Sequence, residues 1–272
     1  MSLLRPGRIT GTVTGQSPTP DRASSRSGCI YCAVVSSRLL TVTFDAEEPA
    51  RLARFWARML GREVVEDPNG SLLLGEDAQI NLRFVPSRSA RVGPNLMHLH
   101  LTSASLADQQ HEVATALSLG ARHRDVGQRP EEGHVVLADP EANEFCIIPP
   151  GSEFLSGCGL LGEVACDGTR EVGVFWSEAL GWPLVWDRNE ETAIQSPAGG
   201  TKVSWGGPPL ASRPGRNRQR LEVTTAEADQ AEEVERLVSL GATLLDVGSD
   251  VDVALADPDG NQFWLTSPLT RE

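Results

Sequence analysis

The chain has 272 residues, of which 40% are hydrophobic and 22% are charged, with a formal net charge of -13 at pH 7. This composition is ordinary for a globular protein, and no apolar run approaches the roughly 20 residues that cross a bilayer. The negative charge repels nucleic-acid phosphates and anionic lipids, so we expect neither nucleic acid nor a membrane as a partner.

Residues 1–37 are expected to form a disordered tail, because they are rich in Ser, Thr, Gly and Pro and show no helix or strand periodicity. Cys29 and Cys32 form a C-x-x-C that no second pair or nearby His completes as a zinc site. The chain holds five cysteines without regular spacing. This usage favours a reducing, cytoplasmic location over a disulfide framework.

Two long phrases occur twice. "FWARMLGREVV" begins at Phe55 and "FWSEALGWPLV" at Phe175, while "LADPEANEFCI" begins at Leu137 and "LADPDGNQFWL" at Leu255. The copies are about 120 residues apart, whereas solenoid repeats are typically 20 to 50 residues long. We therefore predict a tandem duplication, with domains at residues 38–150 and 157–269.

Periodicity predicts the elements of the first copy in order. We expect a strand at 39–44, a helix with apolar residues from Leu52 to Leu60 that ends at Gly61, and strands at 62–66, 71–74 and 79–85. A strand at 96–102, a helix from Leu106 that ends by Gly120, and strands at 122–126, 134–138 and 144–148 follow. The second copy repeats this order, so each copy contains βαβββ twice.

The "ADP" phrase predicts a hairpin. Asp139 and Pro140 suit a type I turn, and Gly260 suits the left-handed residue that follows the turn in the second copy. Ala142 takes that place in the first copy, where a left-handed alanine costs about 1 kcal/mol.

The paired βαβββ order, the "FW...LG" helix end, the "DPxxNxF" hairpin and the "NLMHLHL" strand resemble the vicinal oxygen chelate superfamily. This superfamily contains glyoxalases, bleomycin-resistance proteins and ring-cleaving dioxygenases, and the resemblance is to its glyoxalase-like branch over residues 39–268. It implies an α+β fold of two tandem domains. Each domain would be two βαβββ modules that form a curved mixed sheet, with helices outside and a pocket on the concave face.

Strand alternation assigns side chains of the first domain to opposite faces of the sheet. The apolar set, expected beneath the helices, is Val42, Phe44, Ile80, Leu82, Phe84, Leu99, Leu101, Phe145 and Ile147. The other set, expected to line a pocket, is Thr41, Thr43, Gln79, Asn81, Arg83, His98, His100, Glu144 and Cys146.

The resemblance also implies where a metal would bind, because metal-binding relatives place ligands on four strands. Counting back from "FW", the matching places in the first domain hold Thr41, Gln79 or Asn81, His98, and Cys146. The places in the second domain hold Leu161, Lys202 or Ser204, Arg220, and Trp264. Only His98 is an expected ligand, so we predict no family-type metal centre. A divalent metal held by His98, His100, Glu144 and Cys146 is the alternative.

In the second domain, we expect a salt-bridged structural network of Lys202, Arg220, Glu222, Gln262 and Trp264. Alternatively, Arg220 grips an anionic ligand. His111, His123 and His134 are expected on exposed positions.

The sequence thus predicts a cytoplasmic protein, a monomer or homodimer, that binds a small organic ligand in the cavity of its first domain. One alternative is a lyase, isomerase or dioxygenase, in which His98 acts as a base or metal ligand and Glu144 or His100 assists. A second alternative is a non-catalytic interaction scaffold.

Overall fold

The computed structural model describes residues 37–76, 78–88, 93–212, 217–225, 229–247 and 252–266. The expected tail lies outside these residues, with Cys29 and Cys32, except that Ser37 starts the first strand. None of the helices in the described ranges is long and apolar enough to span a membrane.

Each copy folds as two βαβββ modules. The first copy contains β1 (Ser37–Ala46), α1 (Pro49–Leu60), β2 (Val64–Asp67), β3 (Gly70–Leu73), β4 (Leu82–Pro86), β5 (Met97–Leu101), α2 (Leu106–Ser118), β6 (Arg122–His123), a short 3-10 helix (Pro130–Glu132), β7 (Val135–Ala138) and β8 (Glu144–Ile147). The second contains β9 (Leu161–Cys166), α3 (Arg170–Leu180), β10 (Leu184–Arg188), β11 (Glu191–Ser196), β12 (Gly199–Trp205), β13 (Gln219–Thr225), α4 (Gln230–Ser239), β14 (Thr243–Val247), β15 (Asp252–Ala256) and β16 (Gln262–Thr266). The predicted α+β class and element order are confirmed.

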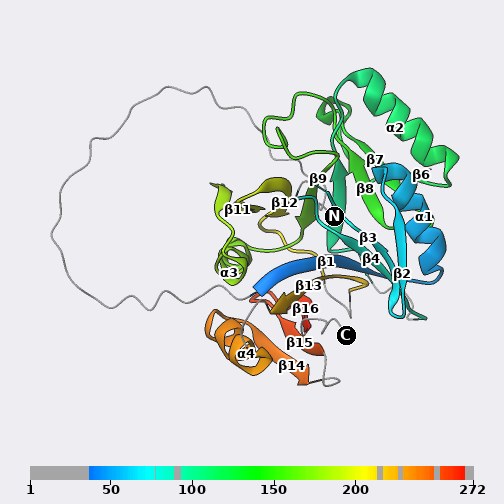
Figure 1. The fold of residues 1–272 in the computed structure, drawn as a ribbon. Coiled ribbons are helices and arrows are strands. Elements are labelled where there is room, and N and C mark those ends of the chain that lie inside the picture. The colour runs from blue at the N-terminus through cyan, green and yellow to red at the C-terminus, as the bar shows by residue number, and fades with distance from the viewer. Residues whose placement is uncertain are drawn as a thin grey trace, which may run out of the picture.

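The strands form two eight-stranded sheets, and each sheet takes one module from each copy. Sheet A has the order β14-β15-β16-β13-β1-β4-β3-β2, and sheet B has the order β10-β11-β12-β9-β5-β8-β7-β6. Strand β1 therefore lies beside β13 although the two are far apart in the sequence (Figure 1). The sequence resemblance implied one sheet per copy, and this expectation is wrong. Each module pairs with another through its first strand, and the residue pattern of a strand does not specify which module will be its partner.

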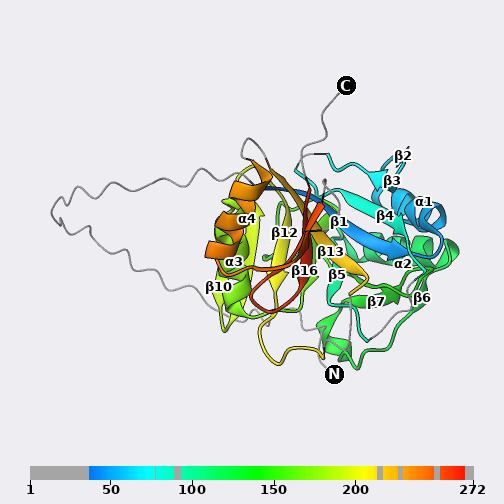
Figure 2. The same ribbon diagram turned by 90° about the horizontal axis from the view of Figure 1, so that it is seen from below.

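Helices cover the sheets in pairs. Helices α1 and α2 lie together at one end of the molecule, and α3 and α4 lie together at the other (Figure 2). Helix α1 ends as predicted at Gly61, which adopts the left-handed conformation with a φ of 65°. All nine residues of the predicted apolar set belong to one core that continues through both sheets and the helices.

The repeated "ADP" phrase joins the two modules of each copy. Trp56 of α1 donates from Nε1 to Asp139 Oδ2 of the β7–β8 turn at 3.1 Å. Trp176 of α3 makes the equivalent bond to Asp257 Oδ2 at 3.4 Å. Because the helix and the turn belong to modules in different sheets, each bond links sheet A to sheet B.

The next acidic residue of the phrase serves the start of a helix. Glu141 accepts hydrogen bonds from the backbone amides of Glu47 and Glu48 at 2.9 and 2.8 Å. Asp259 accepts from the backbone amide of Thr169 at 2.7 Å. Carboxylates near helix N-termini satisfy unpaired amides and favour the helix dipole. The phrase is therefore a device that joins modules.

The turn itself has the predicted geometry. Ala142 and Gly260 are both left-handed, with φ values of 63° and 82°. The strain at Ala142 is offset by Asn143, whose side chain donates to both oxygens of Asp139 at 3.1 and 2.9 Å.

Replacing Trp56 by Phe removes one donor from buried Asp139 and leaves that carboxylate less satisfied. We expect the free energy of unfolding to fall by about 1–3 kcal/mol, the cost of an unpaired buried polar group. Trp176→Phe is the matched variant, and its longer bond predicts a smaller loss. Chemical denaturation of both variants measures this order. If Trp56→Phe is as stable as the wild type, the hydrogen bond from Trp56 to Asp139 does not stabilise the fold.

Candidate functional site

The face of sheet A opposite the core holds a closed ion-pair network. Arg220 donates to Asp45 Oδ1 at 2.7 Å and lies 3.0 Å from Glu222 Oε1, and all three side chains are buried. The guanidinium also stacks on Trp264, 4.2 Å from the ring centroid. Thr41 bonds Thr43 at 2.7 Å. The donors of Arg220 are thus directed to protein groups, which supports the structural interpretation of this residue.

The remaining predicted residues of this sheet also bond to the protein. Asn81 donates to the carbonyl of Leu40 at 2.8 Å, and Arg83 pairs with Asp67 at 2.7 Å. Gln79 lies before β4 and bonds the segment between the two copies. Of the network predicted for the second domain, Gln262 is exposed and Lys202 lies in the other sheet.

Sheet B carries a row of polar side chains across five strands, and an apolar residue of a sixth strand ends the row. The strand register aligns one residue on each of β11, β12, β9, β5, β8 and β7: Gln195, Lys202, Glu163, His100, Cys146 and Val136. The structure thus divides the predicted site residues between two sheets. His98, His100, Glu144 and Cys146 come together in sheet B, whereas Thr41, Thr43, Asn81, Arg83 and Arg220 lie in sheet A or next to it.

His100 and Glu163 form the centre of the row. His100 Nδ1 lies 2.7 Å from Glu163 Oε2, both residues are buried, and Ser204 donates to the other oxygen of Glu163. Burial alone would lower the His100 pKa, but Cys146 and the bonded Glu163 outweigh it and raise the pKa to about 10. Burial opposes ionisation of Glu163 too, yet His100, Ser204 and Lys202 hold its pKa below the ordinary value. The pair is an imidazolium and a carboxylate at neutral pH.

Glu163 was absent from the predicted site. Counting back from "FW" placed Leu161 opposite Thr41, but the sheet registers pair Thr41 with Glu222 and Glu163 with His100. The stretch from the aspartate near the end of the strand to the "FW" of the helix is two residues shorter in the second copy. Alignment of these aspartates, Asp45 and Asp167, gives the right frame.

The other predicted residues lie next to this pair. His98 is buried two residues before His100, beside Glu144 of the neighbouring strand. Glu144 accepts from Asn95 Nδ2 at 2.8 Å and lies 3.5 Å from Arg124. His134 was expected to be exposed, but it is buried before β7, and burial, with a smaller effect of His100, lowers its pKa.

The segment between the copies, residues 149–160, covers part of the row and is called the linker below. Leu155 and Cys158 of the linker pack with Val136, Cys146 and Ile148 of sheet B. Thr102 and Gln79 hold it by bonds to the carbonyls of Gly159 and Cys158, at 2.8 and 2.5 Å.

Lys202 also holds the linker. Its ammonium donates to the carbonyl of Phe154 and lies 4.5 Å from the centroid of the Phe154 ring. That ring packs against Trp186 of β10, with centroids 5.6 Å apart. The ammonium of Lys202 therefore bonds the linker and not a residue of a neighbouring strand.

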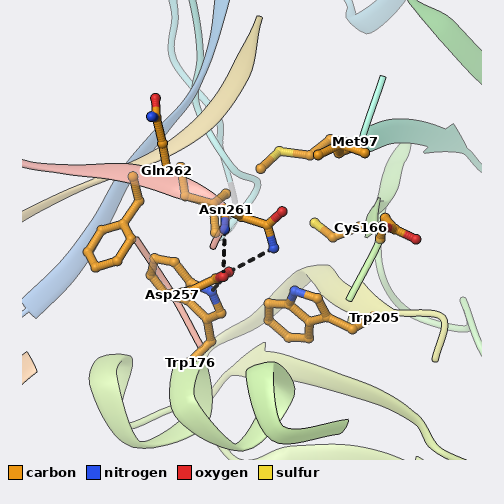
Figure 3. Close-up of a pocket in the computed structure, with 11 residues that line it drawn as sticks. Met97, Cys166, Trp176, Trp205, Asp257, Asn261 and Gln262 are labelled. Atoms are coloured by element: carbon orange, nitrogen blue, oxygen red, sulfur yellow. Dashed lines mark hydrogen bonds between the residues drawn. The ribbon is translucent and has the colours of Figure 1, made fainter. Parts of the chain in front are cut away.

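Two hollows lie near these elements. A cleft of about 640 Å³ runs between the end of α1, Gln79 and the linker, and Cys158 contributes both to its wall and to the cluster beneath the linker. Between the sheets lies a cavity of only about 10 Å³, around which Trp176 and Asn261 converge on Asp257 opposite Cys166 and Trp205 (Figure 3). This space holds about one water molecule, so it belongs to the contact between the sheets.

The donors of the row do not suit a family-type metal centre. The β12 place holds the ammonium of Lys202, which repels a cation, and Glu163 is already bonded to His100 and Ser204. Within the described part of the chain, no three His, Cys, Asp or Glu residues are grouped to hold a metal ion.

Comparison with known proteins identifies the fold. A family model described as a glyoxalase-like domain matches residues 41–148 and 163–266. A search of curated proteins found no match. Glyoxalase I from Zea mays has a TM-score of 0.59 at 15% identity, covering 85% of this chain and 92% of that chain. A putative dioxygenase from Bacillus subtilis has a TM-score of 0.52 at 14% identity, covering 84% of each chain.

At these identities the solved structures show the fold alone, and the family model adds the membership. Because it matches both copies and most of the chain, this protein belongs to the glyoxalase-like domain family, with two tandem domains.

Proposed function

We propose that the protein binds a small organic molecule on the polar row of sheet B, without a metal centre of the family type. The pair of His100 and Glu163 carries this proposal. It lies at the junction of the two copies, where β5 of the first meets β9 of the second. The likeness to a glyoxalase and a putative dioxygenase supports a small-molecule site in the fold.

His100 provides the anchor for such a ligand. Its Nδ1 is bonded to Glu163, whereas its buried Nε2 makes no hydrogen bond of ordinary geometry to a described residue, and only the weakly accepting thiol of Cys146 acts on the ring from the neighbouring strand. The residue is only 8% exposed. An unpaired buried donor costs about 1–3 kcal/mol, so an acceptor atom that enters this site gains a bond that the free protein does not make. On the corresponding face of sheet A, Arg220 is instead bonded to Asp45 and Glu222.

Glu163→Gln tests the site. A thermal-shift screen of aldehydes, catechols and aromatic antibiotics identifies compounds that raise the Tm of the wild type. We expect Glu163→Gln to weaken their binding at least about tenfold, because loss of the carboxylate removes the charge that orients the imidazolium. Isothermal titration measures the loss.

Glu222→Gln is the matched control, since Glu222 occupies in sheet A the place of His100 and also belongs to a buried ion pair. Binding in this variant should equal that of the wild type. Similar binding in Glu163→Gln and the wild type, with both folded by circular dichroism, contradicts a site on sheet B.

The ion pair also predicts how stability depends on pH. The folded-state pKa of His100 lies above the ordinary 6.5, so its stabilising contribution is complete below about pH 6.5 and is lost as pH rises through 10. We expect the free energy of unfolding to fall by at least about 1 kcal/mol between pH 7 and 10. Glu163, Cys146 and His134 are the titratable groups that act on this ring or respond to it.

Urea denaturation at several pH values measures this slope. His100→Gln should flatten it, whereas the exposed His123→Gln should keep it. Cys146→Ser removes the neighbouring thiol that raises the His100 pKa, so it should weaken the slope less than His100→Gln does. An unchanged slope in His100→Gln means that another group causes the pH dependence.

A further inference from the structure

Lys202 is the only lysine among the 272 residues, whereas the other 23 basic residues counted with it are arginines. Its side chain is half-buried in the polar row, next to Glu163. Unlike Arg83 and Arg220 of sheet A, it forms no ion pair with a carboxylate in the described part of the chain, and its bond goes to a backbone carbonyl. An ammonium bonded to a neutral carbonyl gains less than one bonded to an anionic oxygen.

The row places two cations beside Glu163, while Cys146 lies on the other side of His100. Lys202 and the imidazolium of His100 flank Glu163, which is a single carboxylate. Ser204 is neutral and only bonds the same carboxylate. The corresponding positions of sheet A hold Asn81, Thr41 and Glu222, and the carboxylate of Glu222 is balanced by Arg220. The ammonium at the Lys202 position is therefore particular to sheet B, since sheet A has the neutral Asn81 there.

We infer that the ligand of this site is a small organic anion whose carboxylate binds Lys202 in place of the Phe154 carbonyl, with a second oxygen bonded to His100. The inference rests on the proposed function and specifies its ligand class. The Phe154 carbonyl is an internal substitute for the anion, so binding exchanges a neutral acceptor for a charged one. The unpaired Nε2 of His100 gains a partner in the same event.

The linker provides the carbonyl that the anion would displace, and it also provides an apolar ring. Phe154 rests on Trp186, so displacement of its carbonyl moves a ring that can then cover an aromatic ligand. Gly151, Gly157 and Gly159 have left-handed φ values of 87°, 76° and 78°. An added Cβ at the first two of these glycines would meet no atom of the described residues within 4 Å, so no described side chain packs against the linker at these points.

The test compares acids with their neutral counterparts. Phenylacetate and benzoylformate are titrated against the wild type, each beside its primary amide, which has the same shape without the charge. We expect each acid to bind at least about tenfold more tightly than its amide. Lys202→Met should remove this preference, and Lys202→Arg should keep most of it, because the charge is retained.

Arg188→Met is the matched control, because it removes a positive charge from β10 of the same sheet, where Arg188 stacks on Trp186 at 4.7 Å. This variant should keep the preference for acids. A direct signal comes from reductive methylation with ¹³C-formaldehyde, which labels only Lys202 among the side chains. Its NMR resonance should shift with the acids and not with the amides.

Three results overturn the inference. If acids and amides bind the wild type equally, and Glu163→Gln abolishes both, the site on sheet B stands but its ligand is not an anion. If Lys202→Met keeps the acid preference, and the resonance of labelled Lys202 in the wild type does not shift with the acids, another cation recognises the carboxylate. If no acid binds and the broader screen also yields no ligand, the inference fails together with the proposed function.

Discussion

The architecture depends on one hydrogen bond made twice, from a helix tryptophan to a buried turn aspartate. Trp56 to Asp139, and Trp176 to Asp257, each connect a helix of one sheet to a hairpin of the other. Burial raises the pKa of Asp139 to about 6, against the lowering effect of its hydrogen-bond donors, so this carboxylate is held at a considerable desolvation cost. Such a group persists only where several donors converge, which fixes the turn, the helix and their relative position together.

Because these bonds join the modules within a copy, the sheets are free to join modules between copies. The polar face of each sheet is then formed by one module from each copy, and the residues on the two faces differ. Sheet A balances its buried charge internally through Arg220, Asp45 and Glu222. Sheet B keeps an imidazolium with one unpaired nitrogen and an ammonium bonded to a carbonyl. A duplicated fold can thus retain one face for stability and leave the other incompletely satisfied, as expected of a functional site.

Local patterns predicted the elements well, since alternation and helical periodicity follow directly from backbone geometry. The apolar set from Val42 to Ile147 is buried, and Ala142 takes its left-handed conformation. The site was predicted less well because it is assembled from both copies. Its key carboxylate, Glu163, lies on a strand that a two-residue difference in a connection put out of frame, and its cover is the linker, which has no periodicity to read. His134 likewise became buried through tertiary contacts that no local pattern reports.

The donor set of sheet B is poorly matched to the divalent metal that the sequence resemblance implies for metal-binding relatives. A divalent metal needs carboxylates, neutral imidazoles or thiolates that converge without competing partners. Here Cys146 and Glu163 outweigh burial and raise the pKa of His100 to about 10, which favours the imidazolium, and Glu163 uses its second oxygen to bond Ser204. The imidazolium of His100 instead provides the positive charge and a hydrogen-bond donor. In a metal site, the metal ion would attract the oxygens of the ligand. Lys202 extends that positive region by one more strand. Anion recognition by fixed side-chain charges is therefore the chemistry that this arrangement favours.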